Sequence, residues 1–249
     1  MSAEAERRAD RVAPLSAAGS PPAKLLPLVL SIIAGSCDVI GFLGLGGLFT
    51  AHVTGNLVIL AAHLAGGDQA QIAPMLSVPV FMAALGLTRL LVAGLDSIGL
   101  AALRPLLALQ LLLLAGFLAL CVAAGPRVDP NAAIAIVAGM LGVAAMAVQN
   151  ALVPLALKGV PSTAVMTTNI TRFTIDVVEL LAGRDAHEVA AARRRAKQTG
   201  AAILGFVIGC GLGGACEAAV GLWSLALPVA LALAALVMAF AAERDGGQR

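Results

Sequence analysis

Two five-residue strings, HVTGN at residues 52–56 and VMTTN at residues 165–169, decide how this chain is expected to fold. Each has a threonine followed two residues later by an asparagine, and an offset of 113 residues (165 − 52) aligns them. Both interrupt strongly apolar sequence, where an unsatisfied polar group costs several kcal/mol. We therefore expect the strings to form one structural element that occurs twice and surrounds a shared solute site.

The composition indicates an integral membrane protein. Hydrophobic residues make up 60% of the chain and charged residues only 12%, unlike an ordinary soluble domain. The net charge of +2 is too small to indicate a nucleic-acid partner. The apolar runs are continuous and rich in Ala and Leu, which favours helices over strands. Runs of roughly 20 residues, enough to cross a core of about 30 Å, are expected near 25–47, 74–95, 104–124, 132–156, 200–220 and 222–242.

Basic residues predict the orientation of these spans in the cell (inner) membrane. Lys and Arg are concentrated in the polar tail 1–24 and again in the segment 184–197 before the fifth predicted span. Cytoplasmic loops carry such an excess, so both segments are expected to be cytoplasmic. Six spans then place the C-terminus on the cytoplasmic side as well. The cluster at 193–197 is expected to act as a retention signal, with binding of anionic headgroups as the alternative.

Two segments, 48–66 and 158–182, remain outside the six spans, and both contain a threonine motif. The second carries Arg172, Asp176 and Glu179, each of which costs about 2.5–3.5 kcal/mol near the bilayer centre. We therefore expect re-entrant paths: the chain enters in extended form, turns at the motif and returns as a half-helix. Thr and Asn oxygens are expected to cap the half-helix starts. The alternative has eight spans, with both segments crossing.

The order of these elements predicts an inverted repeat. Residues 25–124 and 132–242 each contain a span, a polar half-helix and two further spans, within one membrane domain covering 25–249. Three crossings per half give the halves opposite orientations, as in many secondary transporters. The predicted fold is all-α and polytopic, with six transmembrane helices and two re-entrant half-helices. The positive helix starts would meet near the midplane, placing Thr54 close to Thr167.

Several strings resemble the YoaK-like family of small bacterial membrane proteins. The resemblance covers most of residues 25–242 and is carried by GSCD at 35–38, GGLF at 46–49, TGN at 54–56 and QNA at 149–151. It implies a multi-pass membrane protein, and it implies no substrate, reaction or cofactor. The second motif has Thr168 where the first has Gly55.

Polar side chains in or beside the motifs are the candidate solute-binding residues. Asp38 lies near the middle of the first span, where an ionisable residue indicates function by default; the alternative is a structural ion pair with Arg89. Gln149 and Asn150 could line a pathway or join helices by hydrogen bonds, and joining is favoured. The full candidate set is Asp38, Thr54, Asn56, Gln149, Asn150, Thr167, Asn169 and Arg172.

Two further groups of charged residues have alternative interpretations. Arg172 lies one turn beyond the second motif, where it could face an anionic solute, but an i,i+4 pair with Asp176 is favoured. His52 and His63 could relay protons, although histidines that are merely satisfied on a polar face are commoner.

Small residues in the fifth span predict packing and not chemistry. Glycines at 205, 209 and 213 recur every four residues and are expected to form a close-packing helix face, either inside the monomer or between subunits, with packing inside the monomer favoured. The four cysteines fall in predicted helices without metal-ligand spacing, so they are expected to be buried and free, with no metal or other cofactor.

The leading functional hypothesis is a secondary transporter or channel-like carrier of a small solute. Two converging positive helix starts would favour an anionic or carboxylate-bearing group. The rival is a non-transporting accessory or scaffold protein of the membrane. An enzyme is not expected, because no GxSxG, Walker or complete zincin string occurs. The expected partners are the lipid bilayer and a small solute, without nucleic acid, and a homo-oligomer is left open.

Overall fold

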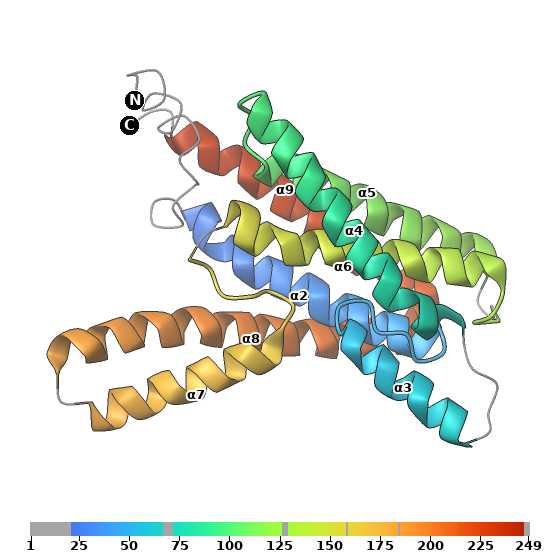
Figure 1. Ribbon diagram of the computed structural model, residues 1–249, viewed down its shortest axis with the longest axis horizontal. Helices are drawn as coiled ribbons and strands as arrows, with labels where there is room; N and C mark the ends of the chain where they lie inside the picture. The colour runs from blue at the N-terminus through green and yellow to red at the C-terminus, as the bar shows by residue number, and fades with distance from the viewer. Residues whose placement is uncertain (1–20, 67–71, 126–128, 158, 184, 247–249) are drawn as a thin grey trace.

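The computed structural model describes residues 21–66, 72–125, 129–157, 159–183 and 185–246, and every regular element in these ranges is helical. The helices, labelled as in Figure 1, are α2 (Pro21–Gly44), α3 (Val53–Gly66), α4 (Ile72–Ser97), α5 (Leu103–Ala124), α6 (Ala133–Ala156), α7 (Met166–Ala182), α8 (Ala186–Val220), the 3₁₀ turn η1 (Gly221–Leu225) and α9 (Ala226–Gly246).

The long helices lie along one common direction and alternate in sense (Figure 1). Helices α2, α5 and α8 run one way, and α4, α6 and α9 run the other way. Five stretches are long and apolar enough to cross a membrane: Leu25–Gly44, Ile72–Ser97, Leu103–Ala124, Ala133–Ala156 and Ala186–Ala242. The chain reverses at η1 inside the last stretch, so that stretch contains two antiparallel helices. The prediction of an all-helical membrane protein is confirmed.

Helix pairing follows a regular pattern. Helix α2 packs against α8 and α9, while α6 packs against α4 and α5. The short helices α3 and α7 each lie against the helix that follows them, α4 and α8 respectively. Apolar side chains fill the interior; its largest fully buried members include Leu30, Ile33, Leu106, Leu114, Phe117, Met146 and Leu152.

The close contact between α2 and α8 depends on glycines. A Cβ added to Gly209 would lie 2.3 Å from the carbonyl oxygen of Ile32, and one added to Gly213 would lie 2.8 Å from the Cα of Ser36. Only a residue without a side chain allows this approach of two helix backbones. The predicted glycine face inside the monomer is therefore confirmed. All four cysteines are free. Cys37 and Cys121 are buried, as predicted, whereas the prediction of burial is wrong for Cys210 and Cys216, which are only partly buried.

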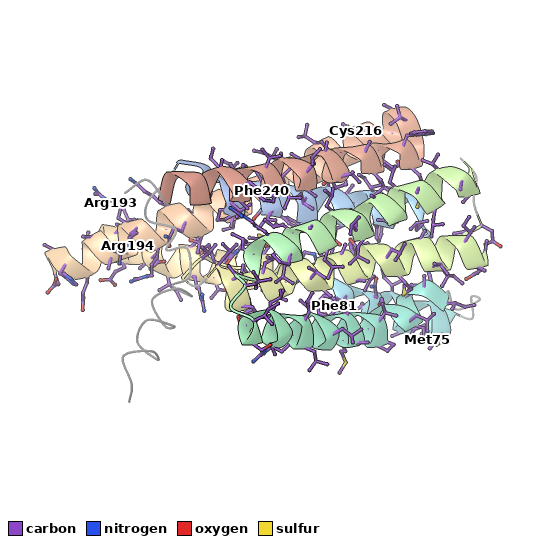
Figure 2. The ribbon with its side chains drawn as sticks, turned by 90° about the horizontal axis from the view of Figure 1, so that it is seen from above. Met75, Phe81, Arg193, Arg194, Cys216 and Phe240 are labelled. Atoms are coloured by element: carbon purple, nitrogen blue, oxygen red, sulfur yellow. The ribbon has the colours of Figure 1, made fainter. Side chains whose placement is uncertain are left out.

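The predicted helix boundaries need one large correction. Helix α8 begins at Ala186, capped by Asp185, whose carboxylate accepts from the backbone N–H groups of residues 187 and 188. It is therefore 35 residues long, about 52 Å at 1.5 Å per residue, where the sequence predicted a span from 200. The first turns of α8 contain the basic cluster at 193–197, so a prediction based on apolar runs did not include them. Figure 2 shows Arg193 and Arg194 at one end of α8 and Cys216 at the other, and the α7–α8 hairpin extends beyond the bundle (Figure 1).

Candidate functional site

The two threonine motifs start the two short helices, as the sequence predicts. Helix α3 begins at Val53 and α7 at Met166, again an offset of 113 (166 − 53). Each is preceded by an irregular entry segment of turns and bends, residues 45–52 before α3 and 159–165 before α7. Each entry segment contains a glycine in the left-handed region, Gly46 with φ +65° and Gly159 with φ +84°. Both helices start alongside the middle of the bundle and run toward opposite ends (Figure 1).

Each motif asparagine binds its own entry segment. The Asn56 side chain donates to the Phe49 carbonyl oxygen and accepts from the Phe49 N–H, both at 2.8 Å, and it also donates to Ser77 Oγ at 2.9 Å. The Asn169 side chain donates to the Ser162 carbonyl oxygen at 2.6 Å. Both asparagines are at most 1% exposed. Each therefore ties a helix start to the residue seven positions earlier, and we call this arrangement the asparagine clasp.

The prediction that Thr and Asn oxygens cap the helix starts is wrong for these asparagines and for α7. The N-cap of α7 is Val165, which makes no side-chain cap bond. Ser162 Oγ instead accepts from the N–H of Val165 at 2.9 Å. The side chains of Thr54 and Thr167 are exposed. Their predicted proximity to each other stays a prediction.

Asp38 of α2 holds the entry segment of α3. Its Oδ1 accepts from the N–H of Ala51 at 2.6 Å, from the N–H of Thr50 at 2.9 Å and from Thr50 Oγ1 at 3.2 Å. Its Oδ2 is bonded to Nδ1 of His52. Asp38 is only 2% exposed, and these donors satisfy a carboxylate that would otherwise be costly to bury. The alternative pair with Arg89 is wrong, because Arg89 lies exposed on α4 and is not among these partners.

The His52 ring is hydrogen-bonded to Asp38, as the interpretation of His52 as a satisfied polar-face histidine predicts. Besides Asp38 it contacts Phe206 of α8 edge-on, with ring centroids 5.3 Å apart. His63, near the end of α3, has a buried Nδ1 that has no hydrogen-bond partner among the described residues. Proton relay by either ring stays a prediction.

Gln149 of α6 holds the entry segment of α7 in the corresponding way. Its Nε2 donates to Thr163 Oγ1 at 3.1 Å and to the Leu30 carbonyl oxygen at 2.8 Å, while its Oε1 accepts from Gln110 Nε2 at 2.7 Å. This buried network joins α2, α5, α6 and the entry segment, so the favoured interpretation of Gln149 as a hydrogen-bonding link between helices is confirmed. Among the described residues, Asn150 donates only within its own helix, to the Met146 carbonyl oxygen, so the favoured interpretation is wrong for Asn150.

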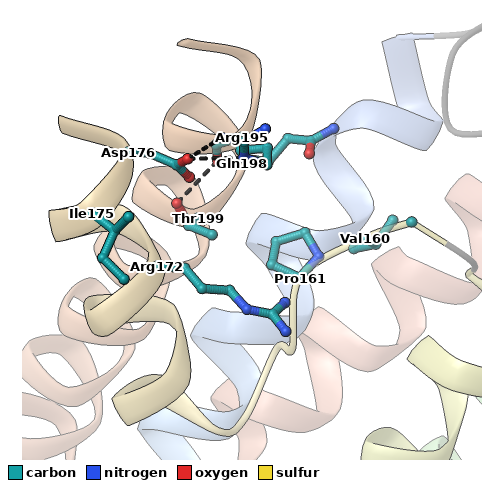
Figure 3. Close-up of a pocket in the computed structure, with 9 residues that line it drawn as sticks. Val160, Pro161, Arg172, Ile175, Asp176, Arg195, Gln198 and Thr199 are labelled. Carbon is teal, nitrogen blue, oxygen red and sulfur yellow. Dashed lines mark hydrogen bonds and ion pairs between the residues drawn. The ribbon is translucent and has the colours of Figure 1, made fainter. Parts of the chain in front are cut away.

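A cavity of about 420 Å³ lies where the α7 entry segment meets the α7–α8 hairpin. Figure 3 shows Arg172 of α7 pointing toward Pro161, with Asp176 and Arg195 on a neighbouring wall. Its lining consists of Gly159, Val160, Pro161, Arg172, Ile175, Asp176, Arg195, Gln198 and Thr199.

The favoured pairing of Arg172 with Asp176 is wrong. Asp176 Oδ1 accepts from Arg195 Nε at 2.8 Å and lies 2.7 Å from Arg195 Nη2. Asp176 faces α8 and is buried, whereas Arg172 lies one turn earlier with an exposed side chain. The guanidinium across the helix contact is therefore the partner of Asp176.

The candidate residues do not gather into one site. Asp38 and Asn56 belong to the α3 entry, Gln149 and Asn169 to the α7 entry, and Arg172 to the cavity, which Asp38 does not line. Sequence reasoning missed Arg195, Gln198 and Thr199. Their i, i+3, i+4 spacing would have placed them on one face, had a helix been expected there.

These observations define a multi-pass helical membrane protein with two clamped entry segments. A family model matches residues 26–238, and the chain belongs to that family, described as "Protein of unknown function (DUF1275)". No curated protein and no solved structure matches the chain.

Proposed function

We propose that this protein is a secondary transporter or channel-like carrier of a small solute, with six crossings and with α3 and α7 as re-entrant half-helices of an inverted repeat. The supporting observation is the helix pairing. In the proposed repeat, α2 corresponds to α6, α3 to α7, α4 to α8 and α5 to α9. Exchanging corresponding helices converts the pair α2/α8 into α6/α4. It likewise converts α2/α9 into α6/α5, and α3/α4 into α7/α8. Each of these pairs packs together, which is the relationship that an internal two-fold axis produces.

The clamped entry segments support a re-entrant path. Irregular backbone at membrane depth persists only where it is buried in protein or lines a cavity. Thr50 and Thr163 are fully buried in the two entry segments, and Asp38 and Gln149 supply their hydrogen-bond partners from the preceding helices. The chain therefore meets this requirement twice. Half-helix starts directed at the midplane would present positive dipole ends to an anionic solute group.

The arrangement also supports a cytoplasmic location of both termini in a bacterial inner membrane. The start of α2 and the end of α9 lie at the same end of the bundle, from which the α7–α8 hairpin also extends (Figure 1). Arg193, Arg194 and Lys197 are exposed on that hairpin. Basic residues are retained on the cytoplasmic side, so we propose that this end of the bundle faces the cytoplasm.

Cysteine accessibility tests the proposal. In a background without native cysteines, Thr54→Cys and Thr167→Cys are labelled with a membrane-impermeant thiol reagent after reconstitution in vesicles. Water-filled access to the half-helix starts predicts labelling of both. Arg193→Cys is the labelled control and Leu112→Cys, on an exposed apolar surface of α5, is the unlabelled one. If both threonine positions behave like Leu112, the carrier proposal is wrong.

The scaffold alternative is favoured by one observation, the apolar outer face of α7. Ile170, Ile175, Val178 and Leu181 are each more than half exposed there. A partner protein that copurifies in fixed stoichiometry and is required for stability would support this alternative. The YoaK-like resemblance stays a prediction under either function.

A further inference from the structure

We propose that the cavity between the α7 entry segment and the α7–α8 hairpin binds a small monoanionic carboxylate through Arg172 and Arg195. Only the identification of this carboxylate as the transported solute depends on the carrier proposal. Binding itself can be tested without transport.

The charges that line the cavity sum to one positive charge. Arg172 and Arg195 each contribute +1, and Asp176 contributes −1. Asp176 is buried and bonded to Arg195, whereas within the described ranges Arg172 has no carboxylate partner. A carboxylate beside Arg172 would therefore neutralise the cavity, while a dianion would leave an excess negative charge.

The structure holds the second guanidinium in place. Arg195 directs Nε and Nη2 at Asp176, and its backbone carbonyl accepts from Thr199 Oγ1 at 3.0 Å. A guanidinium has five N–H donors, so two bonds to Asp176 leave others for a ligand. The two guanidinium groups come from different helices, Arg172 from α7 and Arg195 from α8 (Figure 3).

The chemistry of the walls favours a carboxylate among small anions. A planar guanidinium matches a carboxylate through two parallel hydrogen bonds. The Gln198 amide adds another donor, and Val160, Pro161 and Ile175 provide an apolar side. About 420 Å³ lies within the range of ordinary small-molecule sites. A short carboxylate with an apolar end fits both kinds of wall.

The test uses the full chain in detergent, with sodium acetate as the probe at constant ionic strength. The unfolding midpoint of the wild type should rise and saturate with acetate. Arg172→Gln should weaken the apparent affinity at least tenfold, and Arg172→Lys should weaken it less. The matched control is Arg193→Gln, an exposed arginine on the same hairpin that does not line the cavity, and it should leave the affinity unchanged. Equal acetate affinity in the wild type and Arg172→Gln would overturn the proposal.

Two further arms separate the alternatives. Asp176→Asn raises the lining charge to +2, so succinate should gain affinity relative to acetate; no change in this ratio would contradict the charge argument.

In nanodiscs, stabilisation that requires phosphatidylglycerol and Arg172, with no response to acetate, would identify a lipid headgroup as the ligand and overturn the proposal. Because Arg172 is exposed, Arg172→Gln should elute and unfold like the wild type without acetate. Failure of acetate binding would leave the labelling of Thr54→Cys unaffected, so the two proposals fail separately.

Discussion

Asn56 and Asn169 occupy equivalent places in the two short helices: each is the fourth residue of its helix and donates a side-chain hydrogen bond to the carbonyl oxygen seven residues earlier. The two clasps differ in completeness. Asn56 also accepts from the Phe49 N–H and donates to Ser77, whereas Asn169 Oδ1 is buried without a partner in the described part of the chain.

This difference predicts unequal costs of mutation. Asn56→Ala removes three hydrogen bonds and leaves the N–H and the carbonyl oxygen of the half-buried Phe49 unpaired, so it should destabilise by about 2–4 kcal/mol, at a cost of about 1–3 kcal/mol for each unsatisfied group. Asn169→Ala removes the bond to the Ser162 carbonyl oxygen, a longer one to Met166 Sδ at 3.8 Å and an unpaired oxygen, and should cost about 1–2 kcal/mol. Unfolding in detergent with increasing denaturant measures both. A larger loss for Asn169→Ala would contradict the unequal clasps.

The backbone N–H groups bound by Asp38 predict a local effect. Asp38→Asn replaces charge-assisted bonds to Thr50 and Ala51 with weaker neutral ones, and should destabilise by about 2–3 kcal/mol. Hydrogen exchange should speed up at the amides of residues 50 and 51 before the helices of the bundle are affected. Asp96→Asn, an exposed carboxylate near the end of α4, is the matched control and should change neither quantity. Unchanged exchange at 50 and 51 would refute the clamp.

The sequence predicts where the two short helices begin, but not which partners their polar residues bind. The helix starts at 53 and 166 were predicted to within one residue, because the polar motifs stand out against apolar sequence. The partners suggested for Asp38 and Asp176 are wrong, and no partner was predicted for Asn169. Asp38 binds a segment that returns to α2, and Asp176 binds Arg195 across 19 residues. Such pairs depend on the register between neighbouring elements, which hydrophobicity and helical periodicity do not specify. The predicted span omits the first turns of α8 because they are charged. These turns extend beyond the bundle, where charged side chains are not placed in hydrocarbon and carry no desolvation cost.

The α2–α8 contact predicts opposite outcomes for two glycines of one helix. Gly209→Ala places a Cβ 2.3 Å from the Ile32 carbonyl oxygen, which forces the backbones apart and should cost about 1–3 kcal/mol. Gly211→Ala meets nothing within 4 Å, so it should stabilise by about 0.5–1 kcal/mol through the higher helix propensity of Ala. Thermal unfolding of the two variants beside the wild type measures the difference. Equal behaviour of the two variants would show that α2 and α8 do not pack through this face.

The Asp176–Arg195 pair predicts an asymmetry, because its partners differ in burial. The Asp176 side chain is 5% exposed and the Arg195 side chain 55%. Arg195→Ala leaves a buried carboxylate without its partner and should cost about 2–3 kcal/mol, whereas Asp176→Ala leaves an arginine that water can solvate and should cost about 1 kcal/mol. The double variant should be no less stable than Arg195→Ala, since the stranded carboxylate is then gone. Denaturant unfolding of the four proteins measures the coupling. Additive losses would mean that the two residues do not interact in the folded protein.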